Sequence, residues 1–253
     1  MFTPDDEMRF IILPQVSPFC GPLFFYSRPP SSAAGKVTAS GSFGLVDTGA
    51  KKLLVTCHHV WAAFQEEQAK DPSLTIFLGL GLTRAMALGT PPIDQDKELD
   101  LATFDMESLL PACNRRKFYR VNSLSSNRLK KGDLLFFLGY PGCLRSVSEE
   151  IEHFNGAAYP VIMTGVDGPR FYADISDGTV TRVGKSGISV RDYRHPGISG
   201  SPCFEVRPER PAKLVGFVTS VWRDLLWFTS VDSVNTDGTI KRTAYPPSCG
   251  FVL

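Results

Sequence analysis

The chain contains a serine in a setting that suits a nucleophile, within the segment Gly197-Ile198-Ser199-Gly200-Ser201-Pro202. Flanking glycines permit the tight backbone turn that exposes a nucleophilic hydroxyl, here that of Ser199. On such a turn the backbone N–H groups of Gly197 and Ser199 can converge on the oxyanion that develops during acyl transfer. Glycine and serine are also common in ordinary turns, so this segment by itself is more typical of a structural turn.

A base for such a serine is available in Val55-Thr56-Cys57-His58-His59-Val60. A general base needs a titratable imidazole at the end of an element, where it can reach a substrate. Two adjacent histidines, His58 and His59, follow an expected strand and precede an expected helix, although both also fit ordinary half-exposed positions. The chain has no group of ligands at metal-binding spacing, so we expect no metal.

An acid opens the apolar stretch Asp100-Leu101-Ala102-Thr103-Phe104. Such an aspartate lies either at the solvated end of a strand or in a buried position, where it needs a partner such as an imidazole N–H. Taken alone, Asp100 is more typical of a strand end. The chain order His, Asp, Ser, however, is one of the orders in which a catalytic triad occurs.

Together these segments resemble the motifs of trypsin-like (chymotrypsin-fold) serine proteases. Thr56 to Val60 resembles the family's Thr-x-x-His-Val motif, Asp100-Leu101-Ala102 its Asp-Leu/Ile-Ala strand, and Gly197 to Pro202 its nucleophile loop. The motif register favours His59 as the base and leaves His58 as the alternative. Weaker matches extend the resemblance from about residue 40 to about residue 235, and they lie in 42–46, 132–142, 214–220 and 228–232.

The resemblance implies a fold and a set of roles. The expected fold is all-β, a chymotrypsin-like double six-stranded β-barrel with the active site between the barrels. Ser199 would be the nucleophile, His59 the general base and Asp100 the residue that orients it, while the N–H groups of Gly197 and Ser199 would form the oxyanion hole. No metal or organic cofactor is implied, and the substrate would be a protein or peptide.

Three positions depart from the family pattern. Secreted animal members carry an aspartate immediately before the nucleophile, which pairs with the new amino terminus after zymogen cleavage. Ile198 stands there instead, so this activation route is not expected. Val60 replaces a disulfide-forming cysteine of the secreted members, and Ser201 replaces the second glycine of the nucleophile motif.

The resemblance also suggests a substrate pocket. Tyr193 lies six residues before Ser199, where the family places the base of the primary pocket, and Asp192 is beside it. The opposite wall would consist of Thr219, Ser220 and Val221. If Asp192 rather than Tyr193 points inward, we expect preference for a basic residue at the cleavage site.

The elements that must position these residues are short strands separated by turns. Residues 42–46 and 53–56 flank the turn Asp47-Thr48-Gly49-Ala50 and predict a β-hairpin, and a short helix is expected over 60–67. Further strands are expected over 99–104, 134–138, 161–166, 170–175, 214–220 and 225–230. A break at 122–131 divides the chain into an N-terminal barrel (1–122), a C-terminal barrel (123–240) and a tail (241–253), although strand spacing alone also fits one sandwich.

Composition narrows the remaining possibilities. The 253 residues are 43% hydrophobic, and 27 basic residues balance 26 acidic ones, which argues against disorder and gives no whole-protein basic footprint for nucleic acid. No signal-like start and no apolar stretch long enough to span a membrane is evident, and the six cysteines form no C-x-x-C pair. We therefore expect a cytoplasmic chain with free thiols that binds neither nucleic acid nor membrane.

Two functional hypotheses follow from these observations. The first is a serine endopeptidase, which in a cytoplasm would need regulation by a protein partner. The second is a catalytically idle pseudo-protease that serves as a binding or scaffold module.

Overall fold

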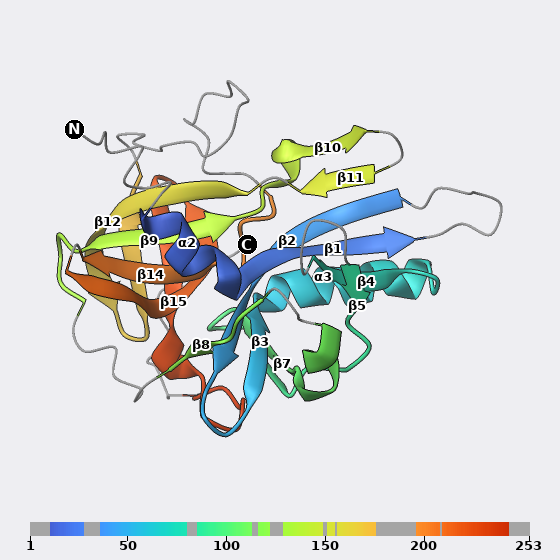
Figure 1. Ribbon diagram of the computed structural model, residues 1–253, viewed down its shortest axis with the longest axis horizontal. Helices are drawn as coiled ribbons and strands as arrows, with labels where there is room; N and C mark the ends of the chain where they lie inside the picture. The colour runs from blue at the N-terminus through green and yellow to red at the C-terminus, as the bar shows by residue number, and fades with distance from the viewer. Residues whose placement is uncertain are drawn as a thin grey trace.

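The computed structural model describes residues 11–27, 36–79, 85–112, 116–121, 129–148, 151–154, 156–175, 196–207 and 209–242. Within them the chain forms two β-structures side by side, a sheet from the first half and a barrel from the second (Figure 1). None of the helices in these ranges is both long and apolar enough to cross a membrane.

The first half forms an eight-stranded sheet. Its strands are β1 (Cys20–Ser27), β2 (Lys36–Asp47), β3 (Lys52–Thr56), β4 (Thr75–Gly79), β5 (Ala85–Ala87), β6 (Asp94–Asp96), β7 (Leu101–Asp105) and β8 (Tyr119–Arg120). They run in the order β5-β4-β1-β2-β3-β7-β6, and β8 pairs with β2 in parallel. The predicted hairpin is confirmed as the antiparallel pair β2–β3, in which Leu45 lies opposite Leu54.

Strand β3 is apolar on both faces because each face is covered. Leu53 and Val55 belong to the apolar cluster shared between the two halves, whereas Leu54 belongs to the core of the first sheet. That core is closed by helix α3 (His58–Lys70), which buries Trp61 and Phe64 against it. The helix predicted over 60–67 is therefore present and extends beyond both predicted ends.

The second half closes into a six-stranded barrel. The strands are β9 (Leu134–Gly139), β12 (Ala157–Asp167), β13 (Arg170–Asp174), β14 (Pro202–Arg207), β15 (Arg210–Trp222) and β16 (Leu225–Ser230), in the closed order β12-β13-β16-β15-β14-β9. Aromatic rings fill the interior, where Phe137 stacks on Tyr159 and Phe171 on Phe228. Strand β10 (Arg145–Ser148) pairs with β11 (Ile151–Phe154) in a separate hairpin. The strands predicted in this half are confirmed.

The prediction of two six-stranded barrels is confirmed for the second half alone. The first sheet has eight strands, and within the described residues no backbone pairing joins its two end strands, β5 and β6. Residues 88–93 connect these strands and include Pro91 and Pro92. The connection adds one hydrogen bond to each neighbouring strand, from the Leu88 N–H to Ile76 of β4 and from the Ile93 N–H to Thr103 of β7, whereas the two prolines between them have no N–H to donate.

The two halves share a core, and each receives a segment from the other end of the chain. Helix α2 (Leu13–Val16) and the 3₁₀ turn η2 (Ser17–Phe19) lie against the barrel, where the side chain of Gln15 accepts the Ala212 N–H at 3.0 Å. In return, the segment after η5 (Val231–Ser233) reaches the first sheet, where Thr103 donates its hydroxyl to Gly238 at 2.6 Å. The predicted limits of the N-terminal barrel, the C-terminal barrel and the tail, at residues 122 and 240, remain predictions.

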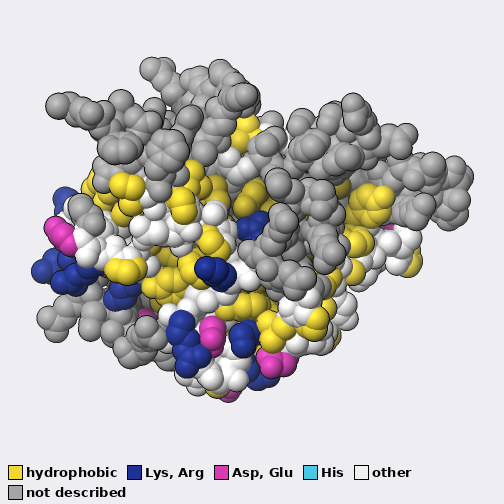
Figure 2. Space-filling view, viewed as in Figure 1, with side chains coloured by type: hydrophobic (Ala, Val, Ile, Leu, Met, Phe, Trp, Pro, Cys, Tyr) yellow, Lys and Arg dark blue, Asp and Glu magenta, His cyan; other side chains and the backbone are white. Residues whose placement is uncertain are grey.

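Two further 3₁₀ turns complete the described structure, η3 (Glu107–Ala112) and η4 (Gly142–Leu144). Figure 2 shows basic and acidic side chains next to one another along the lower rim of the face in view. The described part of this face therefore carries no extended area of a single charge.

Candidate functional site

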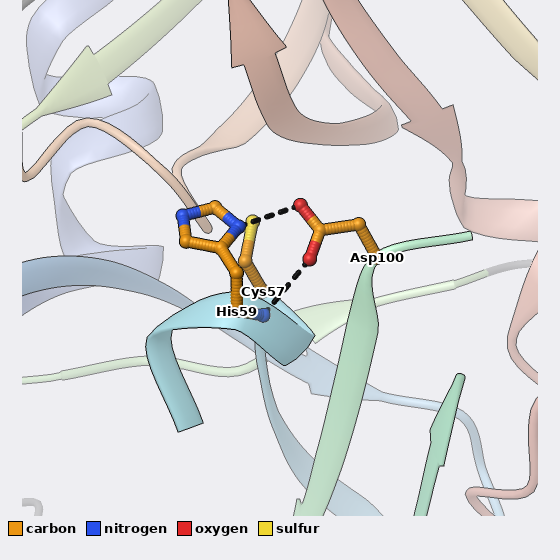
Figure 3. A group of neighbouring side chains, drawn as sticks. All are labelled: Cys57, His59 and Asp100. Atoms are coloured by element: carbon orange, nitrogen blue, oxygen red, sulfur yellow. Dashed lines mark hydrogen bonds and ion pairs between the residues drawn. The ribbon is translucent and has the colours of Figure 1, made fainter. Parts of the chain in front are cut away.

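His59 and Asp100 lie in direct contact. The carboxylate of Asp100 has one oxygen 2.7 Å from Nδ1 of the His59 ring, and its other oxygen accepts the backbone N–H of His59 at 2.9 Å. Figure 3 shows the second ring nitrogen of His59 on the side away from Asp100. The His59 side chain is 49% exposed whereas that of Asp100 is 17% exposed, so the acid is enclosed while the imidazole stays accessible.

The contact with the backbone of His59 also caps a helix. Helix α3 begins at His58, and the residue before it, Cys57, makes no side-chain capping bond. The first N–H groups of a helix have no partner within the helix, and the positive end of its dipole favours an anion. Asp100 supplies both the acceptor and the charge, so the carboxylate that orients the imidazole also stabilises the helix that carries it.

The backbone at Asp100 has an unusual conformation. Its φ angle is 53°, in the left-handed region that residues other than glycine rarely adopt, although aspartate tolerates it better than most. The preceding residue is fixed from the barrel, because Thr229 of β16 donates its hydroxyl to the Leu99 carbonyl at 2.7 Å. The turn that carries Asp100 is thus attached to both halves of the molecule.

Ser199 lies on a tight loop, residues 196–201, which we call the serine loop. Gly197 and Gly200 have φ angles of 107° and 88°, which side-chain-bearing residues rarely adopt. A Cβ on Gly200 would lie 2.2 Å from the Ser42 carbonyl oxygen and 2.5 Å from the hydroxyl oxygen of Thr56. Glycine is therefore required at position 200 by backbone conformation and by space. Because Thr56 ends β3, three residues before His59, the serine loop lies against the strand that leads to the histidine.

The serine loop is attached to the barrel through its neighbours. The Pro196 carbonyl accepts the Gly142 N–H at 2.8 Å, and the Gly200 N–H is donated to Val218 at 2.8 Å. In a planar trans peptide the N–H points opposite to the carbonyl, so the bond to Pro196 also determines where the Gly197 N–H points.

Ile198, the residue before Ser199, is buried in the barrel. Its side chain is 3% exposed and belongs to the core of the barrel. A Cβ on Gly139 of β9 would lie 2.9 Å from Ile198 Cγ2, which shows how closely the two segments approach. Apolar packing therefore holds this part of the serine loop against the barrel.

Cys57 is a third side chain close to His59 and Asp100. It is fully buried, and its thiol donates to the Val218 carbonyl at 3.1 Å. Burial raises the pKa of the Cys57 thiol, and the neighbouring Asp100 carboxylate raises it further. The thiol is therefore kept neutral.

Ligand atoms of Cys57, His59 and Asp100 lie within 4.8 Å of one another, which raises the question of a metal. Two tetrahedral ligands of zinc, each about 2.0–2.3 Å from the ion, lie roughly 3.3 Å or more apart. His59 Nδ1 and Asp100 Oδ2 are 2.7 Å apart, which is a direct hydrogen bond. A protonated thiol is also a poor ligand. The arrangement of these three residues therefore fits a direct hydrogen bond that orients His59 better than it fits the coordination of a metal ion.

Comparison with known proteins bears on the fold. No protein-family model matches the chain, and no curated protein matches it in sequence. Among solved structures, the chain is similar to the crystal structure of Deg5, with a TM-score of 0.52 and 15% sequence identity over 91% of this chain and 92% of that chain. This similarity shows an all-β fold with a closed six-stranded barrel and a sheet, which is consistent with a chymotrypsin-like fold.

The predicted pocket residues are described in part. On β15, Thr219 is buried and donates its hydroxyl to the Trp227 carbonyl at 3.2 Å, Ser220 is exposed, and Val221 packs on the barrel core. Tyr193 and Asp192 lie outside the described residues. The structure thus brings His59 and Asp100 together and places the serine loop against β2 and β3.

Sequence reasoning missed the residues that support this arrangement. The sequence predicts a free thiol at Cys57 and strands that contain Thr229 and Ser42, and it indicates no partner for any of the three. Each makes its important contact with a residue far along the chain. No local pattern identifies such partners.

Proposed function

We propose that this protein is a serine endopeptidase. In the proposed mechanism Ser199 attacks the peptide carbonyl, His59 takes the hydroxyl proton and then delivers it to the leaving amine, and water hydrolyses the acyl-enzyme. Asp100 orients His59 and stabilises its charged form. The N–H groups of Gly197 and Ser199 bind the oxyanion. The observation that carries the proposal is the contact of one Asp100 carboxylate with both the ring and the backbone of His59.

The state of the imidazole supports the role of His59. A carboxylate beside Nδ1 favours the tautomer with the proton on that nitrogen, because a carboxylate only accepts hydrogen bonds. Nε2 is then the basic nitrogen, and it lies on the side of the ring away from Asp100 (Figure 3). Of the two adjacent histidines, the one preferred by the sequence motif is the one that contacts Asp100.

The edge of β15 supports a peptide substrate. Strand β14 pairs with β15 from Arg210 to Phe217, whereas β16 continues along its other side to Trp222. An extended peptide can add as a strand to such an edge, with main-chain hydrogen bonds providing affinity and side-chain pockets providing specificity. We propose that Thr219, Ser220 and Val221 line this position, with Tyr193 and Asp192 at the base of the primary pocket.

The double-barrel form of the fold is also part of the proposal. It is supported by the similarity to Deg5 over 91% of the chain and by the closed barrel of the second half. Residues 80–84, which connect β4 to β5, lie outside the described residues.

A fluorophosphonate probe tests the proposed activity, because it reacts covalently with an activated serine. The wild type should be labelled, and Ser199→Ala and His59→Ala should not. Ser73→Ala is the control, since Ser73 is exposed and lies in a turn after α3, hydrogen-bonded to Asp71. Labelling of Ser199→Ala equal to that of the wild type would exclude Ser199 as the nucleophile. No labelling of folded wild type would instead favour the binding-module hypothesis.

The cytoplasmic, partner-regulated role rests on the sequence and is tested separately. If the fluorophosphonate labels Ser199 but the purified protein does not cleave unfolded casein by itself, the result supports regulation by a partner. Rapid casein cleavage without any addition would contradict it.

A further inference from the structure

Ser42 connects the first sheet to the serine loop through its side chain. It lies on β2 and is fully buried, and its hydroxyl donates to the Gly197 carbonyl at 2.6 Å. The same hydroxyl accepts the backbone N–H of Tyr140, which follows β9, at 3.1 Å. We propose that Ser42 is a positioning residue whose hydroxyl holds the serine loop in the conformation that binds the oxyanion. This inference rests on the proposed endopeptidase function.

The backbone of Ser42 makes two more contacts at the same place. Its N–H is donated to the Ser199 carbonyl at 2.9 Å, and its carbonyl accepts the hydroxyl of Thr56 at 2.8 Å. Thr56 is the last residue of β3 and precedes His59 by three positions. Ser42 therefore joins the strand that leads to His59 with two carbonyls of the serine loop.

All four carbonyls from Pro196 to Ser199 accept hydrogen bonds. Pro196 accepts from Gly142, Gly197 from the Ser42 hydroxyl, Ile198 from the N–H and hydroxyl of Ser201, and Ser199 from the Ser42 N–H. Because each carbonyl direction determines the direction of the following N–H, the bonds to Pro196 and Ile198 set the Gly197 and Ser199 N–H groups, and the two bonds from Ser42 hold the peptide planes that follow these two residues. Ser42 supplies two of the four anchors.

The side-chain anchor matters most at Gly197. Glycine populates positive and negative φ about equally, so the φ angle of 107° at this residue is not imposed by local sterics. A bond to the Gly197 carbonyl from a fully buried hydroxyl supplies the missing constraint. Without it the peptide plane between Gly197 and Ile198, which lies between the two oxyanion donors, can turn and change the position of one donor relative to the other. Misplacement of an oxyanion donor lowers kcat more than it changes substrate binding.

The test compares Ser42→Ala with Thr103→Val. Thr103 is the matched control because it is also fully buried and also donates a 2.6 Å hydrogen bond to a glycine carbonyl, that of Gly238, between the two halves. Folding of each variant is verified by urea denaturation. If Ser42→Ala does not fold, Ser42→Cys, which keeps a weaker donor, replaces it in the same measurements.

For Ser42→Ala we expect kcat on a peptide substrate to fall about 100-fold, with KM changed by less than about threefold. The affinity for a peptidyl boronate, which forms a tetrahedral adduct at the serine, should fall by a similar factor. A purely structural role does not predict this parallel loss. Thr103→Val should keep kcat within about threefold of the wild type. Equal kcat and boronate affinity in Ser42→Ala and Thr103→Val would overturn the inference while leaving the endopeptidase proposal intact.

If the wild type neither cleaves peptides nor reacts with the fluorophosphonate, the proposed function fails. Amide hydrogen exchange then tests separately whether Ser42 positions the serine loop. In Ser42→Ala the amides of Tyr140 and Gly142 should exchange at least about tenfold faster than in the wild type, whereas those of the β2–β3 hairpin should not change. Unchanged protection at both amides would overturn the inference without reference to activity.

Discussion

Asp100 contacts His59 at two points that serve two different purposes. Its Oδ2 lies 2.7 Å from Nδ1 of the ring, and its Oδ1 accepts the His59 backbone N–H at 2.9 Å. The first contact orients the imidazole, and it favours the proton on Nδ1 because a carboxylate only accepts hydrogen bonds. The second caps helix α3, in which the capping position itself is Cys57 and provides no capping side chain. The proposed chemistry and the stability of α3 therefore involve the same carboxylate, and substitution can separate them.

Asp100→Asn should abolish most of the proposed activity and preserve the fold. An amide oxygen can still accept the His59 backbone N–H, but the amide group donates to Nδ1 and imposes the wrong tautomer. We expect kcat to fall by about 10⁴-fold, with a change of less than about 1 kcal/mol in the free energy of unfolding. Asp100→Ala should lose activity and also about 1–2 kcal/mol of stability, because the helix cap is lost.

Peptide hydrolysis and urea denaturation measure these two effects. Asp105→Asn is the control, because Asp105 ends the same strand, β7, and also accepts a backbone N–H, that of Glu107. Its peptidase activity should match that of the wild type. Full activity of Asp100→Asn would show that Asp100 does not set the state of His59.

Gly200→Ala tests whether the serine loop tolerates any side chain at this position. The added Cβ would lie 2.2 Å from the Ser42 carbonyl oxygen, so backbone must move. We expect a loss of about 3 kcal/mol or more in the free energy of unfolding and no fluorophosphonate labelling. Gly132→Ala is the matched control, since Gly132 also has a positive φ, 96°, but nothing lies within 4 Å of its added Cβ.

Denaturation curves of the two glycine variants separate strain from steric overlap. Gly132→Ala carries only the cost of a left-handed alanine, about 1 kcal/mol. If Gly200→Ala costs no more than Gly132→Ala, the close packing of the serine loop against β2 is not maintained in solution.

Much of the fold could be predicted from local sequence patterns. Apolar runs bounded by turn residues predict five of the six strands of the barrel, all but β14, and the hairpin before α3. The resemblance of Thr56 to Val60 to the family motif also favours His59 over His58, and the structure brings that histidine to Asp100. These features depend on neighbouring residues, which a sequence displays directly.

The remaining features depend on contacts between distant residues. The hydrogen bond from Ser42 to Gly197 spans 155 positions, and that from Thr229 to Leu99 spans 130. The eight-stranded sheet also differs from the expected six-stranded barrel, because its pairing depends on which short strands meet at the edges. Neither serine nor threonine in a strand carries a signal for a partner so far away.

Acid should weaken the attachment of the C-terminal segment to the first sheet through Asp94. Burial alone would raise the pKa of Asp94, but hydrogen bonds from the Ile240 and Gln95 N–H groups and from Arg242 outweigh it, so the pKa lies below its ordinary value. A carboxylate with a lowered folded-state pKa stabilises the fold above its unfolded pKa of about 3.9. That stabilisation is lost as the pH falls through the folded-state pKa.

Asp94→Asn should therefore be less stable than the wild type by about 1 kcal/mol at pH 7, and the difference should disappear as the pH falls through the lowered folded-state pKa of Asp94. Urea unfolding at a series of pH values measures it. Glu67→Gln, which breaks the exposed pair with Lys70, should leave the free energy of unfolding unchanged, because solvent screens exposed ion pairs. A difference for Asp94→Asn that grows toward low pH would contradict the assigned role.

Native Cys20, Cys57 and Cys203 should resist alkylation. All three are buried, and burial raises each pKa, that of Cys20 to about 12. At pH 8 the thiolate fraction of Cys20 is then on the order of 10⁻⁴, and the thiolate is the form that reacts. Iodoacetamide treatment followed by peptide mass spectrometry should find these three cysteines unmodified in native protein and modified in urea. Rapid modification of Cys57 in the native protein would mean that the region between His59, Asp100 and β15 opens to solvent. That result would contradict the enclosed position of Asp100.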